Sequence, residues 1–409
     1  MTRLLMRISA SLIAVAELLA SASCSDDNQA ESQPMHIIWS EAESRVALSA
    51  NDIAYELFCH LYSVDDKSLV FSPFSSQMAM AALANGASGA TLEEFQSLLF
   101  PGASLDDLNS YYNKLCTTLP STDRSSRVAI ANSLWYSDDL SLNPDYEQSI
   151  ADVFGASSYA FRLADKQGAT LRINNWISDA TDGKIRDLLS SDKVGTFNLV
   201  NALYFKSEWT NKFDKSKTNT DVFYNIDDTK SAVRFMNGEF PIKIGSVDGN
   251  SEAALVAELP FGNDAFRMVF IKPGEGENPL QALKQVHQQG SAFLENLKEY
   301  DIKLRIPRFE ARTQIEIQEV LSALGFENVM GEQADYSNLC SNHAFAKKMI
   351  QECCIEVDEE GATAATSSSV SGDLLAPPPR YFILDHPFAY MIRETTSGTI
   401  LFMGAVNRM

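Results

Sequence analysis

The sequence predicts an α+β fold in one large domain, on three observations. Segments with helical periodicity alternate with segments of strand character along the middle of the chain, and no stretch repeats another. After a short leader about 385 residues remain, enough to bury a sizeable core. The apolar fraction of 45% is ordinary for a folded protein. We therefore expect helices and sheets to pack around a substantial apolar interior.

Four segments carry helix signals. Apolar residues approximate helical spacing between Ser44 and Leu61, and Ser72 is suited to cap a helix whose first turn holds Pro73. A third helix is expected over Thr170–Leu189, stopped at Asp182-Gly183, and a fourth over Gln314–Leu324.

Strand signals occupy much of the remaining chain. Phe197–Trp209 predicts a buried strand, and Phe266–Lys272 predicts another that ends at Pro273-Gly274. Gly and Asp residues break Asp221–Phe261 into short strand runs, which indicates hairpins. The end of the chain, Phe382–Val406, predicts two apolar strands joined by Thr395–Gly398.

Residues 1–23 have the features of a signal peptide, and residues 24–43 those of a polar tether. Arg3 and Arg7 supply positive charge, and Ile8–Ala22 is largely apolar but short for a membrane span. We therefore expect an exported protein, either secreted or held as a lipoprotein at the outer membrane or cell surface.

Two cleavage outcomes remain open for this leader. Ala20-Ser21-Ala22 suits an ordinary signal peptidase, whereas the residues before Cys24 resemble the lipobox of bacterial lipoproteins. Glu17 interrupts the apolar run, and Ser21 replaces the leucine that a lipobox has before its cysteine. Lipidation of Cys24 is the outcome that we favour.

The net charge of −21 argues against partners that are themselves anionic. Nucleic acid, a heparin-like polyanion and direct adsorption to anionic lipid are therefore not expected, so contact with a membrane would come only through a lipid anchor. The six cysteines form no CxxC pair and no zinc-like spacing, which predicts free thiols, no structural disulfide and no metal. They are Cys24, Cys59, Cys116, Cys340, Cys353 and Cys354.

Catalytic chemistry is not expected either. None of the five histidines sits in a metalloprotease motif or beside a nucleophile motif, and no phosphate-binding loop is present. We expect neither an enzyme nor a cofactor.

The stretch at residues 355–379 is the most unusual part of the sequence. It begins with the strand pattern of Ile355–Asp358 and continues through two acids and Gly361. Ala362–Gly372 is then made only of small or β-branched residues, without charge or proline, before three prolines at 377–379. On composition alone such a stretch is a linker. The dense apolar sequence that follows instead indicates a long loop within a domain, able to join a sheet as a strand.

The run VDEEGATAATSSS at 357–369 resembles the hinge of a serpin reactive-centre loop, and other blocks match that family in order. On these motifs the chain is identified as a serpin, of a bacterial secreted or lipoprotein kind. The other blocks are FSPFSSQMAMAALANGASGATLEEF at 71–95, IANSLWYSDDLSLNPDYEQSIADVFGA at 130–156, INNWISDATDGKIRDLL at 173–189, VNALYFKSEW at 200–209, LRIPRFEARTQIEIQEVLSALGF at 304–326 and DHPFAYMIRETTSGTILFMGAV at 385–406.

The resemblance implies the serpin fold over residues 44–409, with three β-sheets, eight or nine helices and an exposed reactive-centre loop at about 361–379. In the family Ser72 and Ser75 lie where the central sheet opens, and Asn201 matches the shutter asparagine. Trp209 matches the breach tryptophan, and Gln351 replaces the usual shutter histidine. Glutamine can still form the hydrogen bonds of the shutter, but the replacement does not settle whether the shutter responds to pH. The implied hinge is Glu359, Glu360, Gly361, Ala362, Thr363, Ala364, Ala365 and Thr366.

The function that the resemblance implies is inhibition of serine proteases as a suicide substrate. Family spacing places the reactive bond between Leu375 and Ala376, since proline follows directly and disfavours the next bond. A leucine there predicts proteases with an apolar specificity pocket, such as chymotrypsin-, elastase-, cathepsin-G- or subtilisin-like enzymes, or a cysteine protease. We expect a monomer. The alternative is a non-inhibitory serpin that acts as a carrier, chaperone or storage protein.

Overall fold

The computed structural model describes residues 34–249, 253–290, 292–316, 350–360 and 381–409, with most positions between 321 and 341. These residues form eight α-helices and three hydrogen-bonded sheets, so the predicted α+β class is confirmed. The helices are α1 (Glu41–Leu61), α2 (Pro73–Gly86), α3 (Gly89–Leu99), α4 (Leu105–Thr118), α5 (Pro144–Phe154), α6 (Lys166–Ala180), α7 (Pro279–Gln288) and α8 (Ala292–Glu295).

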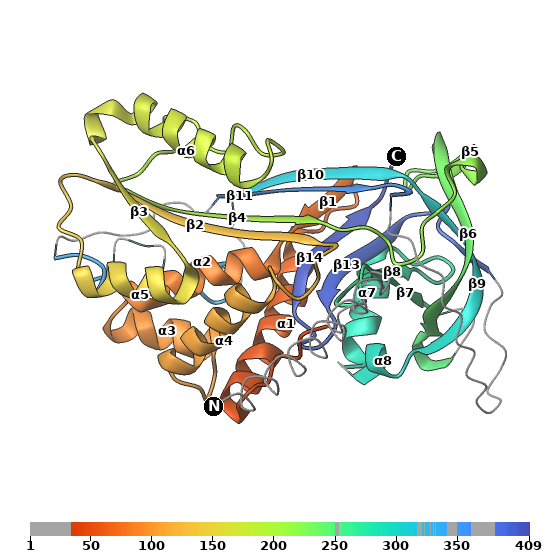
Figure 1. Ribbon diagram of the computed structural model, residues 1–409, viewed down its shortest axis with the longest axis horizontal. Coiled ribbons are helices and arrows are strands. Elements are labelled where there is room, and N and C mark those ends of the chain that lie inside the picture. Colours follow the sequence, from red (N-terminus) through yellow and green to blue (C-terminus); the bar gives the residue numbers. More distant parts are fainter. Residues whose placement is uncertain are drawn as a thin grey trace, which may run out of the picture. The chain divides into compact units, whose positions relative to one another are not determined.

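Fourteen strands are described, and Figure 1 labels most of them. They are β1 (Ser68–Phe71), β2 (Arg127–Ser137), β3 (Ser157–Phe161), β4 (Phe197–Lys206), β5 (Asn219–Tyr224), β6 (Lys230–Ser246), β7 (Leu255–Phe261), β8 (Phe266–Lys272), β9 (Lys298–Pro307), β10 (Phe309–Glu316), β11 (Ile350–Val357), β12 (Tyr381–Ile383), β13 (Phe388–Glu394) and β14 (Ile400–Val406).

Capping residues explain where the first two helices begin. Ser40 accepts a hydrogen bond from the Glu43 amide, and Glu43 accepts one from the Ser40 amide, which makes a reciprocal capping box for α1. Ser72 caps α2 by accepting from the Ser75 amide at 3.0 Å, and Pro73 is the first helical residue. The predicted start of α2 is therefore confirmed.

The largest sheet has the order β1-β14-β13-β8-β7-β6-β9-β12, with β5 paired to β6. Every residue of β13 and β14 is buried, so this hairpin is covered on both faces. Helices α1 and α2 lie against β14, and α7 lies against β8 and β13. The two apolar strands predicted at the end of the chain are thus the centre of the core.

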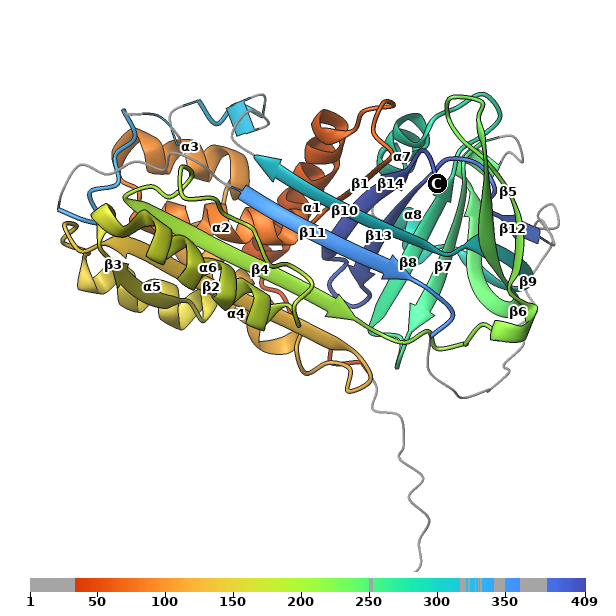
Figure 2. The ribbon, with the colours of Figure 1, turned by 90° about the horizontal axis from the view of Figure 1, so that it is seen from above.

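Two smaller sheets lie beside each other. One has the order β3-β2-β4 and the other pairs β10 with β11. Strands β4 and β11 run side by side in the same direction in Figure 2, and they are close neighbours in space. Helix α6 covers one face of β2 and β4, and α2 lies against the opposite face of β4 (Figure 1).

One predicted helix begins in the wrong place. Residues Gln314–Glu316, expected to begin a helix, are the last three residues of strand β10. Burial along β10 alternates, with Phe309, Ala311 and Ile315 inward, because pairing with β11 gives this segment a period of two. Sheet pairing with a distant strand thus overrides the local helical propensity.

Candidate functional site

The candidate site is the space between β4 and β11, called the gap below. Within the described residues the facing edges of these two strands form no backbone ladder with each other. A cavity of about 410 Å³ lies where both strands end. Its apolar lining includes Tyr204, Phe205, Trp209, Phe261, Ile355 and Val357. Unpaired strand edges next to a cavity form a place where another strand can be added.

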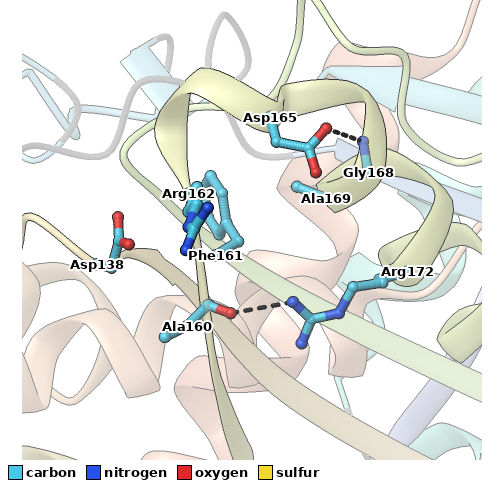
Figure 3. Close-up of a pocket in the computed structure, with 8 residues that line it drawn as sticks. All are labelled: Asp138, Ala160, Phe161, Arg162, Asp165, Gly168, Ala169 and Arg172. Atoms are coloured by element: carbon cyan, nitrogen blue, oxygen red, sulfur yellow. Dashed lines mark hydrogen bonds between the residues drawn. The ribbon is translucent and has the colours of Figure 1, made fainter.

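A second cavity, of about 280 Å³, lies between the start of α6 and the end of β3 (Figure 3). Arg172 on its wall donates to the Ala160 carbonyl at 3.1 Å, and its guanidinium lies 5.1 Å from the Trp135 ring. Asp165 is occupied in capping the Gly168 amide at 2.9 Å. The contacts of Arg172 fasten α6 to β3 and β2.

Gln351, near the start of β11, holds one side of the gap to the start of α2. Its side-chain carbonyl accepts from the Ser72 amide at 3.0 Å, and its NH₂ group donates to the Ser72 carbonyl at 2.9 Å and to Ser76 Oγ at 3.0 Å. The side chain is only 6% exposed. Because all three bonds are buried, β11 is held firmly to the beginning of α2.

β4 is held to the same helix by a second set of amide and hydroxyl groups. Ser75 donates to the Asn201 side chain on β4, and Asn201 donates to Asn132 on β2. Asn132 in turn donates to the Phe154 carbonyl at 2.7 Å, at the end of α5. The helix end at Ser72–Ser76 thus joins both sides of the gap by side chains, where no ladder does. These groups (Ser72, Ser75, Ser76, Asn132, Asn201 and Gln351) are called the shutter lock.

Trp209 closes the other end of the gap, three residues beyond β4. Its indole nitrogen donates to the Asp358 carbonyl at 2.8 Å, directly after β11. Its ring stacks on Phe261, with 4.4 Å between centroids and 11° between planes. One buried aromatic residue therefore ties the ends of the two strands together.

The two acids before Gly361 are both paired. Glu359 is 2% exposed, accepts from Thr218 Oγ1 at 2.6 Å, and has its other oxygen 2.9 Å from the Arg308 guanidinium. Glu360 is paired with Lys215 at the surface, and this hydrogen bond lowers the pKa of the Glu360 carboxyl. The residues that lead into the loop are thus fixed to the body of the protein. A buried carboxylate left without Arg308 would cost several kcal/mol, about 3 or more.

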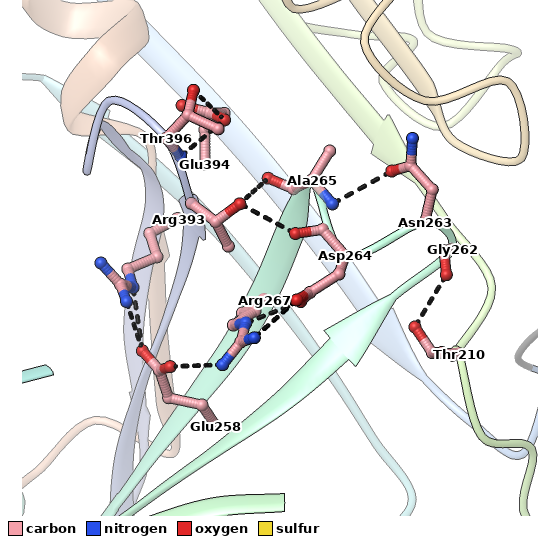
Figure 4. A network of polar contacts seen from close by, with 11 residues as sticks. Thr210, Glu258, Gly262, Asn263, Asp264, Ala265, Arg267, Arg393, Glu394 and Thr396 are labelled. Atoms are coloured by element: carbon pink, nitrogen blue, oxygen red, sulfur yellow. Dashed lines mark hydrogen bonds and ion pairs between the residues drawn. The ribbon is translucent and has the colours of Figure 1, made fainter. Parts of the chain in front are cut away.

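The turn Gly262–Ala265 is bonded to the residues on either side of Trp209, and Figure 4 shows the bond from Thr210 to Gly262. Thr210 donates from its hydroxyl to the Gly262 carbonyl at 2.8 Å, and the Gly262 amide donates to Glu208 at 2.9 Å. Gly262 has φ of +46°, and a Cβ there would overlap the Asp123 carboxylate, so glycine is required.

A buried charge network holds this turn in place (Figure 4). Glu258, fully buried, accepts from Arg267 at 2.9 Å and from Arg393 at 2.9 Å. Arg267 also forms two bonds to Asp264, at 2.7 and 2.6 Å. Burial lowers the pKa of the Arg267 guanidinium, but Asp264 and Glu258 outweigh that effect and raise it above its ordinary value. The charged arginine ties the turn to β7, and Glu258 ties it to β13.

The segment 181–193, which follows α6, connects both sides of the gap. On one side Arg127 of β2 pairs with Asp182 at 2.5 Å. On the other side Lys184 pairs with Glu356 of β11 at 2.9 Å, and Arg312 of β10 donates to the Lys184 carbonyl at 2.9 Å. Opening the gap therefore changes polar contacts on its outer face as well as at its ends.

The structure brings together two groups of the predicted site residues. Ser72, Ser75, Asn201 and Gln351 meet in the shutter lock, and Trp209 lies at the same end of the gap as Glu359 and Glu360. Cys24, Gly361–Thr366, Leu375 and Ala376 lie outside the described residues.

Sequence reasoning missed Asn132, Ser76, Thr218 and Arg308. Each is an ordinary polar residue in an ordinary strand, helix or loop, and no local signal separates it from surface residues. Their partners are distant in sequence: Thr218 meets Glu359 across 141 residues.

The five described cysteines are free thiols; Cys340 and Cys353 are buried, and Cys59, Cys116 and Cys354 are half-buried. Burial raises the pKa of the thiols of Cys59, Cys353 and Cys354, and that of Cys116 to about 12. Such thiols are poor nucleophiles and poor metal ligands at neutral pH. No cluster of acids, histidines and cysteines in the described part of the chain has the geometry of a metal site. Nor is any described helix both long and apolar enough to cross a membrane.

Comparison with known proteins decides the family. Residues 48–409 match the family model described as serpin (serine protease inhibitor). The chain belongs to the serpin family. Iripin-3 of Ixodes ricinus is 30% identical to this serpin over 381 residues, which cover 90% of this chain and 96% of Iripin-3.

Solved structures agree with the fold. The thermophilic serpin tengpin, in its native state, is 25% identical and superposes with a TM-score of 0.78, covering 94% of this serpin and 99% of tengpin. Thyroxine-binding globulin, in complex with thyroxine, superposes with a TM-score of 0.77 at 21% identity and covers 90% of this chain and 99% of its own. The latter likeness concerns the fold alone. Serpins are generally serine protease inhibitors, and the serpin fold with its three sheets is confirmed.

Proposed function

We propose that this serpin inhibits serine proteases as a suicide substrate. The protease serine attacks the carbonyl carbon of Leu375, the bond to Ala376 breaks, and the new amine of Ala376 takes the proton. The acyl-enzyme ester remains on Leu375. The chain upstream of the break then enters the gap as a new strand and carries the protease with it, so that its distorted active site cannot hydrolyse the ester.

The observation that carries this proposal is the gap itself. Strands β4 and β11, of ten and eight residues, face each other without a ladder and are held by side chains at two places. Only Asp358–Glu360 separate β11 from Gly361. A chain that folds back after Gly361 would therefore enter the gap antiparallel to β11.

Length and energy both support insertion. The fifteen residues from Gly361 to Leu375 span roughly 50 Å as a strand, more than the roughly 33 Å of ten-residue β4. A new strand between two free edges gains on the order of a dozen backbone hydrogen bonds, about 10 kcal/mol net. The shutter lock and the Trp209 bond oppose this with five hydrogen bonds, at about 1 kcal/mol each; four tie β4 or β11 to the start of α2 and one crosses the gap.

The sequence of the loop supports the choice of target. Ala362–Gly372 contains no bulky, charged or proline residue that would block burial in a sheet. Leu375 suits an apolar specificity pocket, so chymotrypsin-, elastase-, cathepsin-G- or subtilisin-like proteases are the proposed partners, with cysteine proteases as a further class. The net charge of −21 supports a function without nucleic acid or a heparin-like polyanion.

We further propose that the protein works outside the cytoplasm as a monomer. Residues 1–23 would be removed as a signal peptide, Cys24 would carry lipid, and residues 24–43 would be the tether to the membrane. Metabolic labelling with a fatty-acid analogue, with Cys24→Ser as the control, tests the anchor. Labelling that persists in the Cys24→Ser variant would contradict it.

Incubation with a protease panel tests the inhibitory function. Chymotrypsin, elastase, subtilisin and trypsin are each mixed with the serpin, and complexes are detected on denaturing gels. We expect stable complexes with the first three and cleavage between Leu375 and Ala376 by mass spectrometry. Cleavage without any covalent complex would favour a carrier, chaperone or storage protein instead. Leu375→Arg should transfer complex formation to trypsin, because trypsin requires a basic residue at this position.

A further inference from the structure

Residues 34–39 lie within the segment proposed as a tether, and they expose two large apolar side chains. Met35 is 49% exposed and Ile38 is 81% exposed. The value for Ile38 is the highest among the large apolar side chains that the structure describes. Single exposed apolar residues are common on proteins and need no explanation. Met35 and Ile38, called the apolar pair below, differ in their rigidity and in their place in the chain.

The backbone of the apolar pair is held firmly. The Met35 amide donates to Thr122 Oγ1 at 3.0 Å, and the Met35 carbonyl accepts from Thr396 Oγ1 at 3.3 Å. The Ile38 carbonyl accepts from the Lys114 ammonium of α4 at 3.0 Å. Three distant segments thus fix the pair, so its exposure does not come from a loose chain end. Because the backbone is already ordered, covering these side chains costs little further entropy.

The chain around the apolar pair carries little unpaired charge. Residues 34–39 contain no Lys, Arg, Asp or Glu. Of the two carboxylates that follow, Glu41 pairs with Arg45 at 2.9 Å, and Glu43 is buried and pairs with Lys114 at 2.7 Å. The net charge of the protein is −21, so a segment without carboxylates is unusual on its surface. Such a segment can face an apolar medium without the cost of removing water from a charge.

The length of the preceding chain decides what can cover the apolar pair. Met35 is eleven residues after Cys24, so the two lie at most roughly 40 Å apart, whatever path the intervening chain takes. A folded domain of this size has a radius of gyration of about 21 Å. A lipid on Cys24 would therefore keep a membrane surface close to the apolar pair at all times.

We infer that Met35 and Ile38 insert into the interface of the membrane that holds the lipid of Cys24. This inference rests on the proposed lipid anchor and adds a second contact, which orients the protein. Two apolar side chains alone are too weak to hold a protein of net charge −21 on a bilayer. The anchor makes the second contact intramolecular, with an effective concentration on the order of 1 mM, so a weak contact becomes persistent.

Leu171 of α6 provides a matched control on another side of the molecule. It is a large apolar residue like Ile38, and it is 61% exposed. Helices α6 and α4 lie on opposite sides of strands β2 and β4 (Figure 1), and Lys114 ties the apolar pair to α4. Leu171→Asp therefore adds the same charge as Ile38→Asp at a position that the inferred contact does not include.

The experiment places the full-length, lipid-carrying serpin in phosphatidylcholine vesicles whose acyl chains are brominated. Bromine quenches tryptophan fluorescence at short range, and Trp39, one of four tryptophans, follows Ile38 directly. Wild type should lose up to about a quarter of its emission, because an interfacial segment lies at the boundary of the acyl chains. Trp39→Phe gives the background. Ile38→Asp should reduce the quenching at least threefold, whereas Leu171→Asp should be quenched like wild type.

Flotation of the vesicles on a density gradient shows separately whether each variant is anchored. Quenching that is lost in Ile38→Asp and kept in Leu171→Asp, with both still floating, supports the orienting contact. Equal quenching of these two variants, or a wild type that floats without being quenched, would overturn the contact and leave the lipid anchor standing. A wild type that carries no lipid and does not float would overturn both.

Two further variants complete the test. Ile38→Leu keeps an apolar side chain and should keep the quenching, and its loss there would contradict insertion of this residue. Cys24→Ser should neither float nor be quenched, because the apolar pair does not bind a bilayer without the anchor. Quenching of Cys24→Ser as strong as that of wild type would overturn the dependence on the lipid. Equal melting temperatures confirm that each variant is folded.

Discussion

Replacing Gln351 by leucine tests whether the shutter lock holds the uncleaved state. The change removes three buried hydrogen bonds, those with the Ser72 amide, the Ser72 carbonyl and Ser76 Oγ. The Ser72 carbonyl keeps its bonds from the Ser76 amide and hydroxyl, whereas the Ser72 amide loses its acceptor. Two lost neutral bonds at about 0.5–1.5 kcal/mol each and one orphaned buried donor at about 1–3 kcal/mol give a loss of about 4 kcal/mol.

The assay compares melting temperatures of intact and loop-cleaved protein. At about 2 °C per kcal/mol for a large domain, intact Gln351→Leu should melt about 8 °C below intact wild type. The cleaved form should change much less, because strand insertion would already have opened the lock. Cleaved wild type should itself melt well above the intact form, since its sheet is complete.

A matched control makes the comparison specific. Gln148→Leu makes the same chemical change at an exposed position of α5, where the amide has one bond, to Asp152 at 2.8 Å. Its melting temperature should stay within about 1 °C of wild type. The reasoning fails if intact Gln351→Leu melts no lower than Gln148→Leu, or if both states of Gln351→Leu are destabilised equally.

Two further predictions concern acid stability and the hinge. Burial raises the pKa of Glu43, but bonds from Lys114, Ser110 and the Ser40 amide outweigh it and lower the value to about 2. A carboxyl group whose pKa is lowered in the folded state stabilises the fold above about pH 4.5, and this contribution is lost as pH falls toward 2. Glu43→Gln should therefore lower the free energy of unfolding, measured in urea, by on the order of 3 kcal/mol at pH 7 and by little at pH 2. Equal losses at both pH values would disprove the linkage. Ala362→Arg should raise the stoichiometry of inhibition and yield cleaved serpin, because insertion would bury an unpaired charge; Ala364→Pro should do the same by removing a ladder donor. Unchanged stoichiometry in both variants would refute insertion of the loop.

Much of the fold was predictable because its signals are local. Ser72 and Pro73 mark the start of α2 through the chemistry of a single helix turn. The two apolar runs of β13 and β14 are recognisable because every residue of both is buried. The stretch Ala362–Gly372, which lies outside the described residues, stands out by composition alone, since it lacks charge, bulk and proline over eleven residues.

The start of the helix predicted over Gln314–Leu324 shows how far local signals reach. Its first three residues pair with Ile350–Glu352 of β11, more than thirty positions away in the chain. Ladder hydrogen bonds with that partner set the backbone to a period of two, and no window of neighbouring residues contains this information.

The candidate site also has features that the sequence predicts and features that depend on distant segments. By itself the sequence determined which residue types were available, namely serines at a helix cap, an asparagine in one strand, a glutamine in another and two acids before a glycine. Only the tertiary structure decided that Ser72 meets Gln351 across 279 positions, that Glu359 is buried against Arg308, and that β4 and β11 face each other without a ladder. The physical reason is that burial and hydrogen-bond partnership depend on surfaces contributed by distant segments, and they exist only once the whole core has packed.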